Sequence, residues 1–258
     1  MFLVLRRFFL WAFCGIAVSV QAQYVAYSVG GGIMRYRGDL SWKGSMVYPT
    51  FFAAYHKNMS SHFSWGLRGY WGTLGADDRV DSPTRWRGLN FSSPVMGVEW
   101  ELVFNFRKFL LDVRSASGTF FTVGGVSAFY YSPVAEYEGR RYPLGGMFLE
   151  KDRRLKSGVA IAIPLGVGFK QMLGDRFFIQ TTLRAYPTFS DYLDGASGHY
   201  PKWMDNPDSQ VVSLSNRSIY SPEEVSGKLR ANPQNKDWFF TWTVSLYYVV
   251  LRSVCVVF

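Results

Sequence analysis

Cysteine is scarce in this sequence, and its scarcity excludes one way of stabilising an exported chain. The 258 residues contain two cysteines, Cys14 and Cys255. Cys14 lies in an N-terminal segment that we expect to be removed, which leaves Cys255 alone. A single cysteine forms no intrachain disulfide, so a disulfide-stapled fold is excluded and the mature chain must be held together in another way.

Long apolar runs are also lacking after residue 22, which excludes membrane-spanning helices of about 20 residues. The start of the chain, Met1–Ala22, has Arg6 and Arg7 before a short apolar run and small residues before Gln23. This pattern is typical of a secretory signal peptide, because the apolar run is too short to span a membrane. We therefore expect a signal peptide at 1–22 and one domain at 23–258, with the formal charge lowered by two from +9.

Aromatic residues are abundant, with 9 Trp, 16 Tyr and 22 Phe. The clearest pattern is Gly158–Lys170, where every odd position is apolar and the even positions are small up to Lys170. Such alternation predicts a strand with one apolar face, as a membrane barrel requires, and Pro164 predicts a local distortion in it. An exported, aromatic-rich chain with alternating segments and no spanning helix indicates an outer-membrane β-barrel.

The sequence predicts eight strands, which are in order Tyr24–Tyr36, Met46–Lys57, His62–Leu74, Phe91–Asn105, Thr119–Tyr131, Gly158–Lys170, Arg176–Pro187 and Trp238–Val250. The odd-numbered connections between them lengthen along the chain, whereas the even-numbered ones stay shorter. This asymmetry favours an all-β fold, an eight-stranded antiparallel up-and-down transmembrane barrel. We expect it in the cell outer membrane, with both termini periplasmic and the long loops extracellular. The alternative is a soluble sandwich with an interior core.

A barrel of eight strands is filled by its own side chains and leaves no wide channel. The polar faces of the predicted strands supply five charged residues that we expect to form an interior ion network: Arg68, Glu99, Glu101, Lys170 and Arg184. A structural role in satisfying one another is the interpretation for these residues, rather than catalysis or transport. The chain is therefore a poor candidate for a conduit through which a folded cargo passes.

Several segments carry a family resemblance: Gly30–Gly32, Tyr36–Leu40, Arg85–Phe91, Phe129–Ala135 and, most specifically, Ile163–Lys170 joined to Arg184–Asp194. On these residues the chain resembles the PorG-like outer-membrane β-barrel family of the Bacteroidetes, which includes a component of the type IX secretion system. It departs from the family's pattern at Gly195–Ser197. The resemblance implies a non-catalytic subunit that associates with the periplasmic ring proteins PorK and PorN.

One predicted turn is a candidate for contact with that ring. The connection Phe106–Gly118 is the only sizeable one at the periplasmic end, and cationic residues surround apolar ones in it. The candidate partner-binding residues are Arg107, Lys108, Phe109, Leu110 and Arg114. The alternative is a merely solvated turn.

Two other roles remain open. A lipid-modifying barrel enzyme would require Ser197 and His199 to converge with an acidic residue, which proximity in a polar loop does not establish. A small structural outer-membrane barrel unrelated to secretion would share every fold feature. We expect no catalytic residue and no cofactor. We also expect no metal site, because Asp191, Asp194, Asp205 and Asp208 lack EF-hand spacing for calcium.

Charge also suggests a lipid partner. The connection Ser132–Ser157 is rich in arginine and lysine and, if extracellular, could meet the phosphates of lipopolysaccharide, although acidic residues are interspersed. The alternative is a solvated charged loop. Outer-membrane lipid and lipopolysaccharide are thus expected partners, and nucleic acid is not, despite the pI of about 9.5.

Overall fold

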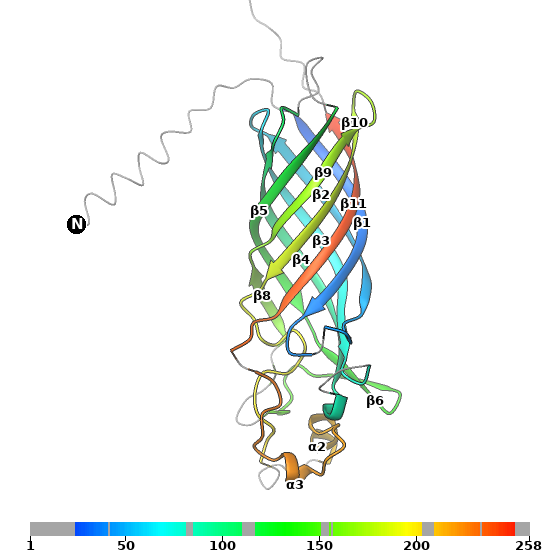
Figure 1. Cartoon of the computed structure of the whole chain (residues 1–258), viewed down its shortest axis with the longest axis vertical. Helices are drawn as coiled ribbons and strands as arrows, with labels where there is room; N and C mark the ends of the chain where they lie inside the picture. Colours follow the sequence, from blue (N-terminus) through cyan, green and yellow to red (C-terminus); the bar gives the residue numbers. More distant parts are fainter. Residues whose placement is uncertain are drawn as a thin grey trace, which may run out of the picture.

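A computed structural model describes residues 24–40, 42–80, 85–109, 117–150, 155, 157–202, 209–232 and 234–250. The expected signal peptide and Cys255 lie outside these residues. The described chain is a closed barrel of long tilted strands, with folded loops gathered at one end (Figure 1).

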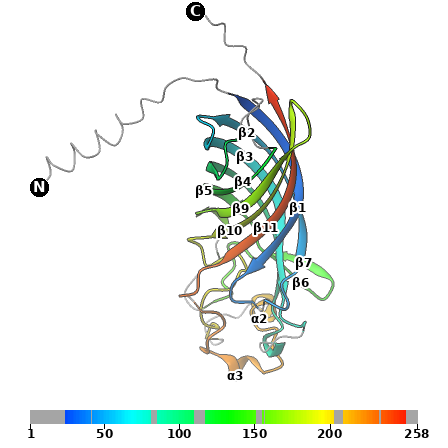
Figure 2. The same ribbon diagram turned by 45° about the horizontal axis from the view of Figure 1, so that its top comes forward.

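Eight antiparallel barrel strands form the wall, and each pairs with the next along the chain. We call each of them a stave, because the sixth consists of two separate strands, β8 and β9. They are β1 (Val25–Arg37), β2 (Val47–Asn58), β3 (Phe63–Asp77), β4 (Asn90–Asn105), β5 (Gly118–Tyr131), β8 (Gly158–Ala162) with β9 (Leu165–Met172), β10 (Phe177–Pro187) and β11 (Trp238–Val250). The first strand pairs with the last over its full length, from Val25 opposite Val250 to Arg37 opposite Trp238. This pairing closes the sheet, so the predicted eight-stranded barrel is confirmed and the sandwich is excluded (Figure 2).

The distortion predicted at Pro164 divides the sixth stave into β8 and β9. Both pieces pair with β5 in one continuous register, and Gly125 donates its backbone N–H to the carbonyl of Pro164. Proline has no N–H with which to return that bond, so one ladder hydrogen bond is missing while the strand direction is kept.

Alternation along the strands separates a lipid-type outer face from a filled interior. In the sixth stave Val159, Ile161, Leu165 and Val167 are exposed, whereas the even positions Ala160 and Ala162 are buried. The other staves repeat this pattern with outward Trp71, Met96, Phe120, Leu183 and Trp242. A closed barrel with an apolar outer belt satisfies its backbone internally, which is the architecture of outer-membrane proteins.

The interior is packed closely against small residues of β1. A Cβ added at Gly30 would lie 2.5 Å from the carbonyl oxygen of Val244, and one added at Gly32 would collide with the backbone of Trp242 and Thr243. These glycines therefore let β1 and its neighbours approach where a side chain would force them apart.

The two ends of the barrel differ. The short-turn end carries the connections 59–62, 106–117 and 173–176, and the long-loop end carries 38–46, 78–89, 132–157 and 188–237. The long loops form a cap with elements that alternation did not predict: η1 (Arg85–Arg87), the hairpin β6 (Val134–Tyr137) and β7 (Arg140–Pro143), α2 (Ser209–Ser215) and α3 (Pro222–Val225). Among the described residues, no helix has the length and apolarity to cross a membrane.

The cap has an apolar core of its own, separate from the barrel interior. It consists of Ala135, Leu144, Leu149, Leu155 and Leu214, with Tyr137, Tyr142, Met147 and Tyr192 packed against them. Because these residues come from two loops distant in sequence, burying them ties the loops together over the barrel mouth.

Candidate functional site

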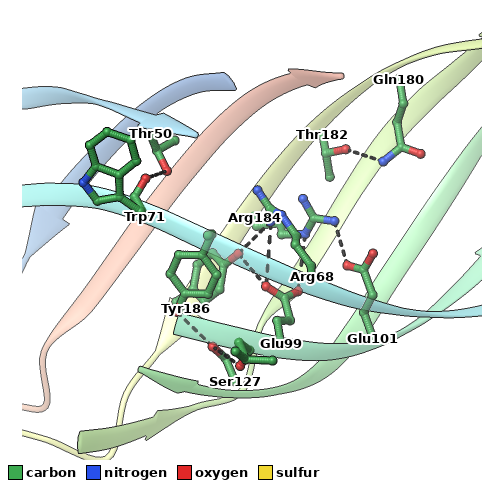
Figure 3. A network of polar contacts seen from close by, with 12 residues as sticks. Thr50, Arg68, Trp71, Glu99, Glu101, Ser127, Gln180, Thr182, Arg184 and Tyr186 are labelled. Carbon is green, nitrogen blue, oxygen red and sulfur yellow. Dashed lines mark hydrogen bonds and ion pairs between the residues drawn. The ribbon is translucent and has the colours of Figure 1, made fainter. Parts of the chain in front are cut away.

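Two charged clusters lie on the barrel axis, one inside the wall and one beneath the cap. In the first, Arg184 of β10 bridges two carboxylates of β4: its Nη2 is 2.7 Å from Glu101 Oε2 and its Nε is 3.6 Å from Glu99 Oε1. Arg68 of β3 approaches the same Glu99 at 3.7 Å. All four side chains are buried, and Figure 3 shows them pointing toward one another across the interior. Charges withdrawn from water in this way are tolerated because they pair.

Two residues not singled out from the sequence complete this interior network. The Tyr186 hydroxyl donates to Glu99 Oε2 at 2.8 Å and accepts from Arg68 Nη1 at 3.0 Å (Figure 3). His56 Nε2 lies within hydrogen-bonding distance of Glu101 Oε1. His56 lies on β2, three residues after the outward Ala53, so its side chain points inward. The alternation of side chains along β2 would have predicted from the sequence that His56 points into the barrel.

Lys170 was expected to join the ion network, and the structure gives it a different partner. Its ammonium donates to Asn105 Oδ1 at 3.0 Å and lies 4.6 Å from the ring centre of Phe121. No described carboxylate lies within ion-pair distance of it. A neighbouring cavity of about 20 Å³, lined by His56, Asn105 and Lys170 among others, has room for about one water molecule.

At the short-turn end, apolar side chains close the barrel. Phe109 stacks edge-on against Phe178 at 5.4 Å, and Phe178 stacks face to face with Tyr247 at 4.3 Å. Phe109, a candidate partner-binding residue, is therefore buried in the barrel mouth, where its ring covers the apolar end of the interior. Arg107 and Lys108 are exposed, and Leu110 and Arg114 lie outside the described residues.

Beneath the cap, the hydroxyl of Tyr36 lies between the carboxyl groups of Asp194 and Asp237. The Tyr36 hydroxyl lies 2.8 Å from Asp194 Oδ2 and 2.6 Å from Asp237 Oδ1, and it accepts the backbone N–H of Asp39. One hydroxyl proton serves only one carboxylate at a time. Burial, reinforced by neighbouring carboxylates, raises the pKa of both Asp194 and Asp237 well above the usual range. Both carboxyl groups therefore favour the protonated form in the folded protein.

A second acidic group lies beside this pair. Ser197 donates its hydroxyl to Asp191 Oδ2 at 2.5 Å, and its backbone N–H goes to Glu150, which is held by Arg230 at 2.9 Å. Burial raises the pKa of Asp191 to about 6, against the opposing effect of the Ser197 hydrogen bond. His199 is exposed, whereas Ser197 is buried and engaged by acids. The convergence that a serine–histidine hydrolase needs is therefore not what these contacts provide.

No cluster of three or more His, Cys, Asp and Glu side chains suited to an ion occurs among the described residues. Asp191 accepts a hydrogen bond from Ser197, and Asp194 is hydrogen-bonded to Tyr36. The other two acids considered for calcium, Asp205 and Asp208, lie outside the described residues.

The sequence matches a known protein family over most of its length. Residues 6–206, from the N-terminal segment through most of the cap, match the model of a family described as a domain of unknown function, DUF6089. The chain belongs to the DUF6089 family. The match ends before β11, so the strand that closes this DUF6089 barrel lies beyond the matched region. A comparison with curated proteins finds no match to the chain.

Solved structures similar to this DUF6089 protein are small outer-membrane barrels. OprG from Pseudomonas aeruginosa gives a TM-score of 0.44 at 7% identity, covering 90% of this chain and 97% of its own. The attachment invasion locus protein Ail of Yersinia pestis, in complex with the heparin analogue sucrose octasulfate, gives 0.42 at 12%, covering 89% and 100%. Neisserial surface protein A gives 0.38 at 7%, covering 88% and 97%.

Proposed function

We propose that this protein is a non-catalytic outer-membrane barrel subunit of the type IX secretion system, which meets the periplasmic PorK and PorN ring with its short-turn end. The observation that carries the proposal is the filled interior. Ion pairs occupy the middle of the barrel, and Phe109, Phe178 and Tyr247 close one end. A barrel without a wide channel acts through its ends rather than as a conduit.

The short-turn end offers a fixed cationic surface for that contact. The backbone N–H of Arg107 is bonded to Thr119 Oγ1 at 3.0 Å, and that of Phe109 to the carbonyl of Ser61 at 3.1 Å. Between these anchors, Arg107 and Lys108 are exposed. The buried Phe109 thus anchors the described start of the turn, where Arg107 and Lys108 are exposed. The resemblance of Ile163–Lys170 and Arg184–Asp194 to the PorG-like family supports the choice of partner.

The orientation belongs to the proposal. The short-turn end, where β1 begins and β11 ends, faces the periplasm, and the long-loop cap faces outside. Short periplasmic turns and long external loops are the usual arrangement of such barrels.

Co-isolation from the native outer membrane tests this function. An affinity tag inserted between Glu138 and Gly139, in the exposed turn of the β6–β7 hairpin, leaves the short-turn end free. After cross-linking in cells and mild-detergent extraction, mass spectrometry should find PorK and PorN with the barrel. Recovery of the barrel alone would remove the secretion role and leave a small structural barrel.

Charge variants locate the contact. The double variant Arg107→Ser with Lys108→Ser should lose most of the ring proteins, because the two exposed cations in the described part of the turn are removed. Arg176→Ser is the matched control, since Arg176 is an exposed cation in the neighbouring turn at the same end. Equal recovery of the ring from the double variant and the control would place the contact elsewhere.

A further inference from the structure

At the long-loop rim of the closed barrel, one edge of β8 has no full strand partner among the described residues. β8 pairs with β5 along one edge over Gly158–Ala162. On its other edge the pairing with the chain after β10 stops at the bridge of Ala162 with Thr188 and the hydrogen bond from Phe189 N–H to Ile161 O. Beyond that point the chain turns inward to the buried Asp191. Among the described strands, nothing pairs with this edge from Gly158 to Ala160.

A cleft of about 490 Å³ lies at this gap. Its outer part is lined by the exposed apolar side chains of Val159, Ile161 and Phe189, of which Val159 is 75% exposed. Its inner part reaches Tyr131 and Asp191, which point into the barrel. An apolar opening of this kind in the lipid-facing wall suits a hydrocarbon chain better than a soluble anion.

A second hollow of about 430 Å³ adjoins the cleft and is cationic. It is lined by Arg37, Gly38, Asn235, Lys236 and Trp238, and Lys236 lines both the hollow and the cleft. Arg37 and Lys236 are exposed, and neither forms a salt bridge with another described residue. These two exposed cations lie beside the apolar outer part of the cleft and make the site amphipathic, with Asp191 in the cleft as the acidic group that Lys236 acts on.

Aromatic side chains place this site at headgroup depth. Arg35 stacks over the Trp42 ring at 3.9 Å and donates to the Trp42 carbonyl, and Trp42 packs edge-on against Phe240 at 6.0 Å. Trp238 continues the row along the outside of β11. Tryptophan and arginine gather where hydrocarbon meets lipid headgroups, which is the level at which lipid phosphates lie.

We propose that this site binds one acylated phosphate lipid of the surrounding leaflet. The phosphate lies between Arg37 and Lys236, and an acyl chain follows Val159, Ile161 and Phe189 into the gap beside β8. Charge complementarity selects the phosphate, and the apolar cleft selects a lipid over free phosphate. The site is separate from the short-turn end and from the basic loop Ser132–Ser157, so it does not rest on the secretion role.

Photolabelling of the full chain in nanodiscs tests the site. The nanodiscs contain phosphatidylcholine and a trace of phosphatidic acid with a diazirine on its acyl chain. Mass spectrometry should find the label concentrated on Val159, Ile161 and Phe189. The double variant Arg37→Gln with Lys236→Gln should reduce this labelling by about ten-fold, since two charge-assisted phosphate contacts are lost.

Matched controls separate the site from general lipid contact. Arg140→Gln with Arg141→Gln removes two exposed cations of β7 at the same end and should leave labelling unchanged. Val159→Trp, which fills the cleft without altering charge, should reduce labelling, and a slower-migrating unheated band on SDS gels would identify any variant that fails to fold. A photoreactive diacylglycerol should label the cleft much more weakly than phosphatidic acid.

Three results would overturn the proposal. They are label spread evenly around the outer face of the barrel, labelling unchanged in the Arg37 and Lys236 double variant, and complete competition by millimolar inorganic phosphate, which would indicate an ion site. Repetition with a phosphorylated lipopolysaccharide fragment as competitor identifies which lipid class binds more tightly. Either order of affinity supports a phosphate-lipid site, because both carry the same phosphate and acyl groups.

Discussion

The guanidinium of Arg184 lies 2.7 Å from the carboxylate of Glu101, although their strands β10 and β4 are separated in the wall by the staves β5 and β9. The bond therefore crosses the interior and joins two sides of the barrel. With Arg68, Glu99 and Tyr186 it forms the ion network that fills the middle of the molecule.

Removing one partner of the Arg184–Glu101 ion pair should destabilise the barrel. Glu101→Gln or Arg184→Met alone removes the closest partner of a buried charge. Arg184 then keeps only the longer contact to Glu99, or Glu101 only the hydrogen bond to His56, and we expect the free energy of unfolding to fall by about 3–5 kcal/mol. The double variant should lose less than the sum of the two single losses. Urea unfolding from lipid vesicles measures this double-mutant cycle. The variant Glu136→Gln, at an exposed position, is the control. Additive losses would contradict a direct coupling.

Close packing across the β1 seam gives a second prediction. A methyl group at Gly32 would collide with the Trp242 and Thr243 backbone, so Gly32→Ala should destabilise the closed barrel by about 1–3 kcal/mol. At the outward Gly69, where an added Cβ meets nothing within 4 Å, the same change should be neutral or slightly stabilising. Heat-modifiable migration on SDS gels compares the two. Equal behaviour would mean that the seam is not tightly packed.

The architecture was predictable because a strand repeats every two residues, and a barrel requires that repeat in every stave. Val159, Ile161 and Val167 identify their outer face by chemistry alone. The inward position of Arg68, Glu99, Glu101 and Arg184 follows from the same parity. Pairing partners across the interior depend instead on register and strand tilt, which composition does not encode. For this reason Lys170 was expected near a carboxylate and lies on Asn105.

The ends of the barrel were less predictable for a different reason. Phe109 lies among charged residues, and a local pattern does not reveal that its ring covers the barrel mouth. The cap follows no short repeat either: its core joins Leu144 and Leu149 to Leu214, some 65 residues away in a separate connection. Such contacts are set by the folded barrel rim that brings the loops together.

The hydrogen bonds of Tyr36 beneath the cap lead to a third prediction. Tyr36→Phe removes the hydroxyl between Asp194 and Asp237, leaving two buried carboxyl groups without that partner. We expect a local loss of about 1–3 kcal/mol, seen as faster hydrogen exchange in residues 190–197 and at the start of β11. Tyr27→Phe, on the exposed outer face, is the control and should leave exchange unchanged.

The pKa of Asp191 predicts how the cap responds to pH. It is raised to about 6, above an ordinary value of about 3.9, so the folded cap favours the protonated acid. The stabilisation from this group is complete below about pH 4 and is lost as the pH rises through about 6. Hydrogen exchange of residues 190–197 should therefore accelerate between pH 4 and pH 7 beyond its intrinsic pH dependence. Asp191→Asn should flatten this excess, and an unchanged profile would exclude Asp191 as its source.

The barrel interior is filled by its own side chains, and we propose that the protein acts through its two ends. Conductance of the purified wild-type protein in a planar lipid bilayer tests this most directly. We predict no stable ion-conducting steps, because the ion pairs of Arg68 and Arg184 and the aromatic plug around Phe109 fill the interior. Reproducible open steps from the wild-type barrel would contradict the claim and make the protein a channel.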